Sequence, residues 1–271
     1  MEYTLVELMI VAASRLLEDR KSVLVGTGMP LAAAALAQKT HAPELVLVFE
    51  AGGLGPQLPR MPISVGEALT YYRGLEAGGM DNVMGAAARG MIDYGFLGAA
   101  QVDPFGNVNT TVIGDYHHPK ARLPGSGGAN DIGSLCWQTI IVGKHERRRF
   151  VRKLDFLTTP GFLDGKGARE RAGLPRDTGP YRVVTTLGVM GFDAETRWMK
   201  LLATYPGVTV AEVQDNTGFE LVVDGEVGVI EPPTAEELRA LREDVDPLGL
   251  VTGRARRGPP QGRPFPETPS P

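Results

Sequence analysis

Hydrophobic and polar residues follow different periods in successive segments of the chain. Near the N-terminus, YTLVELMIVAASRLL places apolar residues at helical spacing, and Thr4 with Glu7 three positions later forms a capping box. This pattern predicts an amphipathic helix over residues 4–18. Two apolar runs follow, SVLVGTG at 22–28 and ELVLVFE at 44–50, and both are typical of strands. The second is continuous enough to be buried on both faces of a parallel sheet.

The segment between these two strands predicts a helix that crosses over the sheet. Pro30 precedes the alanine-rich run LAAAALAQKT, and proline is favoured in the first turn of a helix. A strand, a helix and a second strand in this order imply a right-handed crossover and an open α/β sheet. Ligands bind such sheets just beyond the carboxyl ends of the strands, which is where Glu50 lies.

Further elements are predicted along the rest of the chain. Helix-forming residues occupy 66–79 and 80–90, and a capped helix is predicted at 234–247. Strands are predicted in IDYGFLGAAQVD (92–103), SLCWQTIIVG (134–143), FVRKLDFLTT (150–159), YRVVTTLGVMGF (181–192), WMKLLATYP (198–206) and FELVVD (219–224).

These elements indicate an α/β fold, with an open and mostly parallel sheet flanked by helices. No linker interrupts residues 1–251, so we expect them to form a single domain. Residues 252–271 are rich in proline, glycine and arginine and cannot bury enough apolar surface to offset ordering. We predict a flexible tail there, with an arm that clasps a partner chain as the alternative.

Composition and charge exclude several classes of function. The formal net charge of −4 argues against general nucleic-acid binding, and the basic run at 144–149 is typical of a solvated face. No apolar segment is long enough to span a membrane, so a cytoplasmic protein is expected. Cys136 lies in an apolar segment and is interpreted as a buried structural thiol. The four histidines and this cysteine lack metal-ligand spacing, so no metal site is predicted.

Glu50 is the first candidate for chemistry, in the segment VFEAGGLGP. A lone carboxylate at the end of a buried strand could simply cap a helix or pair with an arginine. However, three glycines follow Glu50, at positions 52, 53 and 55. Because glycine has no Cβ, a bulky ligand could approach the carboxylate closely along this stretch of Gly52, Gly53 and Gly55. A carboxylate in this position can serve as a nucleophile or as a base.

Two further segments could line the same site. FLGAAQVDPFGNVN carries Gly98 and Ala99 at a strand-to-loop turn, where exposed N–H groups can hold an oxyanion; a tight turn packed on a helix is the alternative. The segment LPGSGGANDIGS (123–134) is glycine-rich, and such loops often let a cofactor lie on the backbone. Its spacing matches neither nucleotide-binding glycine motif, so no nucleotide site is predicted.

Taken together, these segments resemble the β-subunit half of the family I CoA-transferases, most closely its glutaconate branch. The resemblance covers about residues 1–225 and rests on six segments in one order. They are VFEAGGLGPQLPRMPISVGEA, IDYGFLGAAQVDPFGNVNTTVIG, RLPGSGGANDIGS, KLDFLTTPGFL, GPYRVVTTLGVMGFD and LLATYPGVTVAEVQDNTGFE.

The resemblance implies a ping-pong transfer of CoA from an acyl-CoA to a carboxylic acid. The family's glutamate nucleophile corresponds to Glu50, which would carry CoA as a covalent glutamyl-CoA thioester. The family's oxyanion and thioester-binding turn corresponds to Gly98, Ala99 and Gln101. Gly127 and Gly128 fall in a family loop near the active site and are expected to line the pocket, as are Gly52 and Gly53. CoA is implied as a substrate, with no permanently bound cofactor.

The resemblance also implies that a second chain is needed. The glycine-rich motif of the family's other half, which ends in phenylalanine, does not occur in this sequence. We therefore expect an α subunit, in an α2β2 or larger assembly, with the active site at the interface. Two alternatives stay open: a hydrolase of CoA thioesters from the same superfamily, and a non-catalytic scaffold for an α chain. The acyl group and the acceptor acid are not specified by the sequence.

Overall fold

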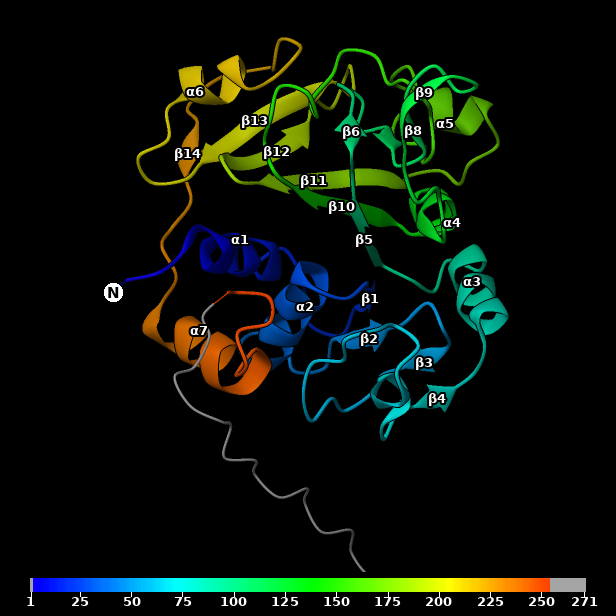
Figure 1. The fold of residues 1–271 in the computed structure, drawn as a ribbon, viewed down its shortest axis with the longest axis vertical. Coiled ribbons are helices and arrows are strands. Elements are labelled where there is room, and N and C mark those ends of the chain that lie inside the picture. Colours follow the sequence, from blue (N-terminus) through cyan, green and yellow to red (C-terminus); the bar gives the residue numbers. More distant parts are fainter. Residues whose placement is uncertain (1, 254–271) are drawn as a thin grey trace, which may run out of the picture.

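A computed structural model of the chain describes residues 2–253 and contains one large mixed sheet. Its ten strands are β1 Ser22–Leu24, β2 Val46–Val48, β3 Gly53–Leu54, β4 Glu76–Ala77, β5 Tyr94–Gly98, β10 Gln138–Gly143, β11 Gly179–Thr185, β12 Gly188–Phe192, β13 Met199–Thr204 and β14 Gly228–Val229. They lie in the order β14-β13-β12-β11-β10-β5-β1-β2-β3-β4, as can be followed in Figure 1.

The five central strands of this sheet are parallel. β11, β10, β5, β1 and β2 pair in parallel, whereas β3 and β4 at one end and β12 and β13 toward the other pair antiparallel to their neighbours. The predicted α/β fold is therefore confirmed. β12 and β13 lie in the predicted strand segments 181–192 and 198–206, whereas β3 and β4 were not predicted. The parallel centre brings the carboxyl ends of β1, β2 and β5 to one edge, with Leu24 paired to Val48 on one side and to Gly95 on the other.

Helices cover both faces of the sheet. The α-helices are α1 Leu5–Ser14, α2 Met29–Lys39, α3 Met80–Ala88, α4 Ala129–Leu135, α5 Ala168–Arg171, α6 Val210–Asp215 and α7 Ala235–Arg239, with a 3-10 turn η1 Ala68–Tyr71 and a π-helical turn η2 Ala240–Val245. α1, α2 and η2 bury their apolar residues in one core cluster, and α3, α4 and α6 bury theirs in a second. Figure 1 shows α1, α2 and α7 side by side, with α3 and α4 grouped away from them.

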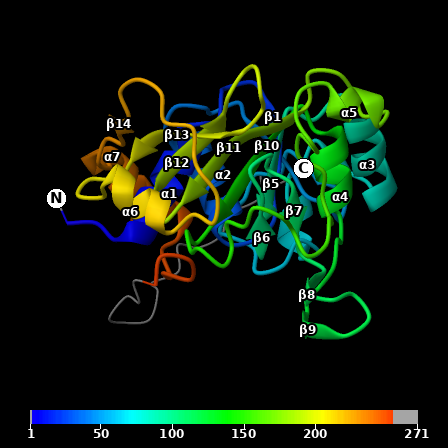
Figure 2. The same ribbon diagram turned by 90° about the horizontal axis from the view of Figure 1, so that it is seen from above.

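Two short antiparallel pairs stand apart from the main sheet. β6 Gln101–Val102 pairs with β7 Val108–Asn109, and β8 Val112–Gly114 pairs with β9 Pro119–Arg122. Figure 2 shows the β8–β9 hairpin extending away from the body of the molecule. After β9 the chain runs through the glycine-rich loop 123–128 directly into α4.

The predicted helix starts are confirmed by the hydrogen bonds that cap them. The Glu7 N–H donates to the Thr4 hydroxyl over 3.2 Å, and the Thr4 N–H donates to the Glu7 carboxylate over 2.8 Å. Pro30 lies in the first turn of α2, as expected. A second capping box, formed by Thr234 and Glu237, begins α7. Helix α1 ends at Ser14, four residues earlier than predicted.

Three predicted elements are wrong. Residues 66–79 form only the 3-10 turn η1 and the strand β4, because their glycines let the backbone fold closely against β3. Residues 150–159 form no strand; their backbone bonds to Val102 and Val108 only in isolated bridges. Residues 219–224 likewise contribute one bridge, from Val222 to Lys200. In the last two cases, the alternating apolar residues pack against other segments without extending the sheet.

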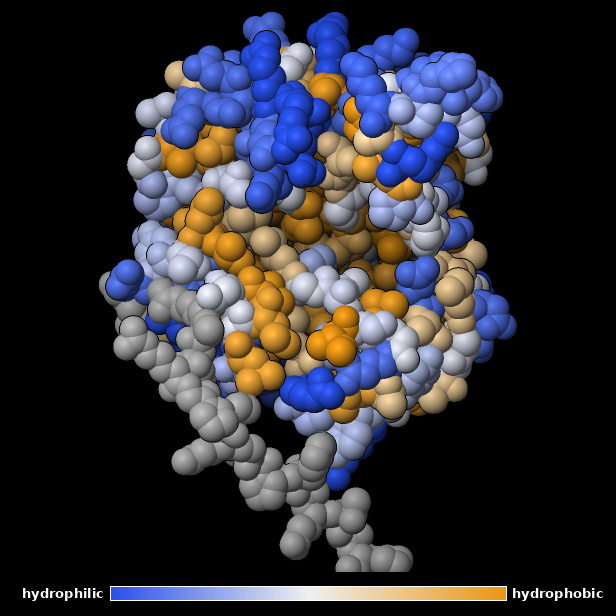
Figure 3. Space-filling view, viewed as in Figure 1, coloured by the Kyte–Doolittle hydropathy of each residue, from blue (hydrophilic) through white to orange (hydrophobic). Residues whose placement is uncertain are grey.

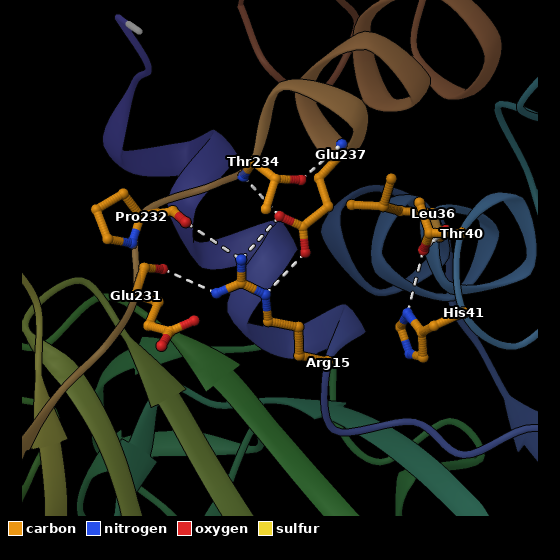
Figure 4. A network of polar contacts seen from close by, with 8 residues as sticks. All are labelled: Arg15, Leu36, Thr40, His41, Glu231, Pro232, Thr234 and Glu237. Atoms are coloured by element: carbon orange, nitrogen blue, oxygen red, sulfur yellow. Dashed lines mark hydrogen bonds and ion pairs between the residues drawn. The ribbon is translucent and has the colours of Figure 1, made fainter.

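Two arginines fasten the C-terminal helical segments to α1. Arg242 of η2 donates to the Glu7 carboxylate of α1 over 2.6 and 3.0 Å. Arg15 binds the Glu237 carboxylate through Nε and Nη2, at 2.7 Å each, and donates to the carbonyls of Glu231 and Pro232 (Figure 4). Thr252, where the predicted tail begins, is still bonded to the Asp246 carboxylate. The rest of the predicted tail, residues 254–271, lies outside the described residues.

The surface of the molecule is unevenly divided between apolar and polar residues. Figure 3 shows apolar residues gathered in a hollowed band across the middle of one face, while the upper part of that face is mostly hydrophilic. Leu5, Leu248 and Leu250 are exposed apolar side chains at the start of α1 and after η2. Within residues 2–253, none of the helices has both the length and the apolar character needed to cross a bilayer.

Candidate active site

Glu50 lies two residues beyond β2, in a turn held by the segment that follows β3. The Tyr71 hydroxyl donates to the Ala51 carbonyl over 2.6 Å, and the Gly78 N–H donates to the Gly52 carbonyl over 2.9 Å. The Glu50 side chain is half-buried. No hydrogen-bond donor or cation within residues 2–253 pairs with its carboxylate. The turn therefore presents an unpaired carboxylate at the carboxyl edge of the parallel strands.

The glycines after Glu50 serve this turn in a way that the sequence did not reveal. A Cβ on Gly52 would lie 2.2 Å from the Gly78 carbonyl oxygen, and one on Gly53 would lie 1.9 Å from the Thr70 carbonyl oxygen. Gly52 also has a φ of +123°, which L side chains rarely adopt. In the structure both glycines therefore pack against the chain's own backbone. Their interpretation as openings for a ligand is not supported by these contacts.

Gly128, by contrast, lies directly against the Glu50 carboxylate. A Cβ at this position would be 2.7 Å from Glu50 Oε1 and 3.1 Å from the Met84 methyl carbon. Gly128 is buried at the start of α4 and has an ordinary φ of −77°. Its neighbour Gly127 has a φ of +48° and faces open space. The structure thus brings together Glu50 and the glycine-rich loop, although they are far apart in the sequence.

Helix α4 reaches this position because it packs very closely on β5. A Cβ on Gly95 would lie 2.4 Å from the Ile132 Cγ2 atom and 3.1 Å from Cys136 Sγ. Cys136 is fully buried, as predicted, and burial raises the pKa of its thiol to about 12. This contact sets the height of α4 above the sheet and so the position of Gly128 beside Glu50.

A second turn lies at the same edge of the sheet, at the end of β5. Gly98 is exposed, and a Cβ there would meet nothing within 4 Å. The Ala99 N–H donates to no group within the described residues, whereas the Ala99 carbonyl accepts from Arg149 over 3.0 Å. A free N–H beside open space can receive an oxyanion or a carbonyl oxygen.

Gln101 is predicted to bind the thioester, and its side chain is bonded inside the protein. It is 6% exposed; its amide nitrogen donates to Asp155 over 3.0 Å, and its oxygen accepts from Asn109 over 2.7 Å. Asp155 also accepts from the N–H of Gly114, the last residue of β8. In this arrangement Gln101 fixes the turn that carries Ala99, and direct contact with a thioester stays a prediction.

Strand register relates the two turns to each other. Val48, Leu24 and Gly95 are aligned across β2, β1 and β5. Because neighbouring strands lie about 4.8 Å apart, β2 and β5 are separated by roughly 10 Å. Both Glu50 and Ala99 follow this line toward the carboxyl edge. The two turns are thus separated by about the width of the intervening strand β1.

Several residues of this site were missed by reasoning from the sequence. Met84 of α3 lies beside Gly128, Tyr71 donates to the Ala51 carbonyl of the turn, and Arg149 donates to the Ala99 carbonyl. Arg149 belongs to the basic run at 144–149, whose other contacts include ion pairs to Glu146. No sequence motif marks Met84 or Tyr71, and only the three-dimensional packing of the chain brings them near the site.

Arg60 and Arg122, which lie near these segments in the sequence, are bonded to other residues. Arg60 pairs with Glu67 over 2.6 Å, and Arg122 donates to the Tyr116 carbonyl while lying 4.9 Å from the centre of its ring. Residues 2–253 contain no cluster of three or more His, Cys, Asp or Glu side chains placed to hold a metal ion. Among the described residues placed at this site, the Glu50 carboxylate and the Ala99 N–H are polar groups without a partner.

Known proteins resemble this chain over most of its length. A family model described as coenzyme A transferase matches residues 6–216. The chain is 41% identical over 256 residues to one of the subunits of glutaconate CoA-transferase from Acidaminococcus fermentans, and the match covers 90% of this chain and 93% of that one. It is also 41% identical over 247 residues to one of the subunits of 3-oxoadipate CoA-transferase from Pseudomonas knackmussii, covering 89% and 92%.

The fold is shared as well. The crystal structure of glutaconate coenzyme A-transferase from Acidaminococcus fermentans superposes with a TM-score of 0.87 at 39% identity, covering 92% of this chain and 97% of that one. The similarity therefore extends from the sequence motifs to the whole three-dimensional arrangement that positions Glu50.

Proposed function

The chain belongs to the coenzyme A transferase family, and we propose that Glu50 is the nucleophile through which it moves CoA from an acyl-CoA to a carboxylic acid. One observation carries this proposal: the Glu50 carboxylate lies at the carboxyl edge of the sheet with no partner within the described residues, in a space that only a glycine at position 128 leaves open. A structural carboxylate would normally be paired.

The proposed reaction proceeds in two reversible halves. Glu50 attacks the carbonyl carbon of the acyl thioester, which forms a mixed acyl–glutamyl anhydride and releases the CoA thiolate. The thiolate attacks the glutamyl carbonyl, which forms glutamyl-CoA and releases the first carboxylate. An acceptor carboxylate then attacks glutamyl-CoA, and the same steps in reverse give the new acyl-CoA and free Glu50.

Each attack creates a negatively charged oxygen that needs a donor. The Ala99 N–H is free within the described residues, directly follows the exposed Gly98, and lies at the same edge of the sheet as Glu50. We assign it as a donor to this oxyanion. Arg149 and Gln101 hold the turn in place through the Ala99 carbonyl and through Asp155, so that the N–H direction is fixed before substrate binds.

The site is open on one side, and a second chain is proposed to close it. The glutaconate and 3-oxoadipate relatives are each named as one subunit of a CoA-transferase, so each works with at least one other chain. By analogy this chain acts as a β subunit with an α partner, in an α2β2 or larger assembly. An anhydride exposed to water would hydrolyse, which is a chemical reason for covering Glu50 during the reaction.

For the substrate, we propose a short dicarboxylic acid and its CoA thioester. The names of the two relatives include glutaconate and 3-oxoadipate, which are both short dicarboxylates. In this chain Arg60 and Arg122 are already bonded, to Glu67 and to Tyr116. The cation for the second carboxylate is therefore expected on the α subunit.

The test is to trap the covalent intermediate in the assembled complex. The chain is co-purified with its α subunit, incubated with a dicarboxylyl-CoA or acetyl-CoA, and treated with borohydride, which reduces an enzyme-bound thioester. Peptide mass spectrometry is expected to find the reduced residue at position 50. Glu50→Ala should lose the label and at least ~10³-fold of the transfer rate, since the nucleophile is gone. Normal transfer in Glu50→Ala would refute the proposal.

Product analysis separates the alternatives. A transferase gives the acceptor's CoA thioester in an amount equal to the donor consumed. A hydrolase would release free acid and CoA without labelling the acceptor. A scaffold would support transfer that does not depend on Glu50 at all.

A further inference from the structure

We propose that Arg169 is a positioning residue for Glu50 and acts through helix α4; this inference rests on the proposed role of Glu50. The Arg169 guanidinium lies at the opposite end of α4 from Gly128. Its Nη2 donates to the Gly133 carbonyl over 3.0 Å and to the Ser134 carbonyl over 3.4 Å, both in the last turn of the helix. It thus binds the end of α4 that is remote from Glu50.

The same guanidinium binds the loop on which α4 rests. Its Nη1 donates to the carbonyls of Pro160 and Gly161, over 3.3 and 2.8 Å, and its Nη2 donates to the Thr178 hydroxyl over 2.8 Å. One side chain therefore joins the helix to the loop 160–161 and to the segment before β11.

Keeping Arg169 in this place is energetically expensive. The residue is 2% exposed, and within residues 2–253 no carboxylate forms an ion pair with it. Burial lowers its pKa to about 10, although the nearby Glu170 opposes this shift. Its Nε finds no acceptor among the described residues. A buried cation paired only with neutral oxygens is costly unless the geometry that it enforces is needed.

The geometry that Arg169 enforces is the position of α4, a helix too short to be stable without contacts to the rest of the protein. The helix has seven residues, so its two ends are only about 10 Å apart, and a helix of this length has little stability of its own. A displacement at the Arg169 end is therefore passed to Gly128 with little loss. Since Gly128 borders Glu50 Oε1, the carboxylate would move or turn with it.

Besides its packing on Gly95 of β5, α4 is restrained by the same loop that Arg169 binds. Asn130 donates to the Thr158 carbonyl over 2.9 Å, and a Cβ on Gly133 would lie 2.2 Å from Thr159 Cγ2. Residues 158–161 are in turn tied to Arg169 through the carbonyls of residues 160 and 161. Loss of the guanidinium would loosen both the helix and the surface against which the helix is placed.

The experiment uses the assembled complex and the variant Arg169→Lys, which keeps the charge but cannot bridge the five oxygens that the guanidinium binds. We expect kcat per folded complex to fall about 10- to 100-fold, because a displacement on the order of 1 Å at the reacting group has effects of this size. KM for the acyl-CoA should change less than about threefold, since the binding surfaces are intact. In a single turnover, the intermediate that borohydride traps on Glu50 should appear more slowly than in the wild type. The rate of its appearance should fall by the same factor as kcat.

Arg15→Lys is the matched control. Arg15 also donates to two main-chain carbonyls, but it lies between α1 and α7 and its hydrogen bonds reach no part of the Glu50 turn. A purely structural role for Arg169 predicts that both variants lose stability and that both keep normal turnover per folded complex. That result would overturn the inference.

Thr178→Val provides a second, milder variant if Arg169→Lys does not fold. It removes one acceptor of the guanidinium and is expected to lower kcat by a smaller factor in the same direction. Normal turnover in folded Thr178→Val, when Arg169→Lys cannot be obtained, would also overturn the inference. Glu50→Ala keeps the two proposals distinct: if Glu50→Ala is inactive and Arg169→Lys is normal, only the role of Arg169 fails.

Discussion

A single missing methyl group at position 128 leaves room for the Glu50 carboxylate. Gly128 has a φ that alanine adopts freely, so Gly128→Ala adds only a Cβ that would lie 2.7 Å from Glu50 Oε1. The atom that must move is the end of a flexible side chain, so the melting temperature is expected to stay near that of the wild type. Transfer should fall about 10- to 100-fold as the carboxylate is displaced, measured as kcat of the α–β complex.

Gly66→Ala is the control for this substitution. A Cβ on Gly66 would meet nothing within 4 Å, and the residue lies in the loop before η1. Its transfer rate is expected to match that of the wild type. If Gly128→Ala also transfers CoA at the wild-type rate, Glu50 does not react from the position in which the structure places it.

His145 couples the stability of the fold to pH. Its ring lies between the hydroxyls of Thr185 and Thr217, at 3.0 and 2.9 Å, stacks on Phe150 and is 4% exposed. Burial lowers its pKa to about 4, from 6.5 in the unfolded chain. The folded state therefore binds the proton less well, and His145 costs stability progressively as the pH falls from 6.5 toward 4.

We expect His145→Gln to remove this dependence. Burial raises the pKa of Asp103 to about 6, so protonation of Asp103 stabilises the folded state as the pH falls through part of the same range. The variant must therefore be compared with the wild type at each pH. Between about pH 7 and about pH 5, the free energy of unfolding of the variant relative to the wild type should rise by about 2 kcal/mol. Urea unfolding of both proteins measures the difference, and parallel pH profiles would contradict the assignment.

At the scale of elements, the sequence predicts the helices whose starts are determined by residues close together in the chain. The capping boxes at Thr4 and Thr234 and the proline at the start of α2 each fix a helix start with neighbouring residues only. The local pattern of residues 66–79 favours a helix, but close packing of Gly52 and Gly53 against this segment is a long-range effect that prevents it. Helix α4 at the end of the glycine-rich loop is hidden for the same reason, since Gly95 on another strand makes room for it.

Arg15 attaches helix α7 to the end of α1, and Arg242 attaches the following turn η2 to Glu7 of α1. The pair of Arg15 with Glu237 has two hydrogen bonds of 2.7 Å, and the side chains are 28% and 14% exposed. Arg15→Met is expected to lower the free energy of unfolding by about 1.5–3 kcal/mol, the range for hydrogen bonds to charged groups. Hydrogen exchange should accelerate in 235–239 and stay unchanged in the central strands, since η2 is still held by the pair of Arg242 with Glu7. Equal acceleration in β1 and β5 would mean that α7 is part of the same cooperative unit.

At the scale of the whole molecule, the sequence locates the parts of the site but not how they meet. Glu50 and the two glycine-rich segments can be selected as candidates from strand ends, small residues and family resemblance. The contact of Gly128 with Glu50, the free N–H of Ala99 and the internal bonding of Gln101 depend on the packing of α4 and β5. Arg169 has no motif at all, because its role comes from oxygens that three separate segments bring together.

The open side of the site leads to a prediction about the isolated chain. Glu50 is half-buried by its own chain and has no partner within residues 2–253, so water can reach any anhydride formed on it. With acetyl-CoA and borohydride, the chain alone should acquire at least ~10-fold less label at Glu50 than the same amount of chain with its α subunit, an effect of ~1.4 kcal/mol or more on the barrier. Glu50→Ala with the α subunit gives the background. Equal labelling with and without the α subunit would show that this chain holds a complete site by itself.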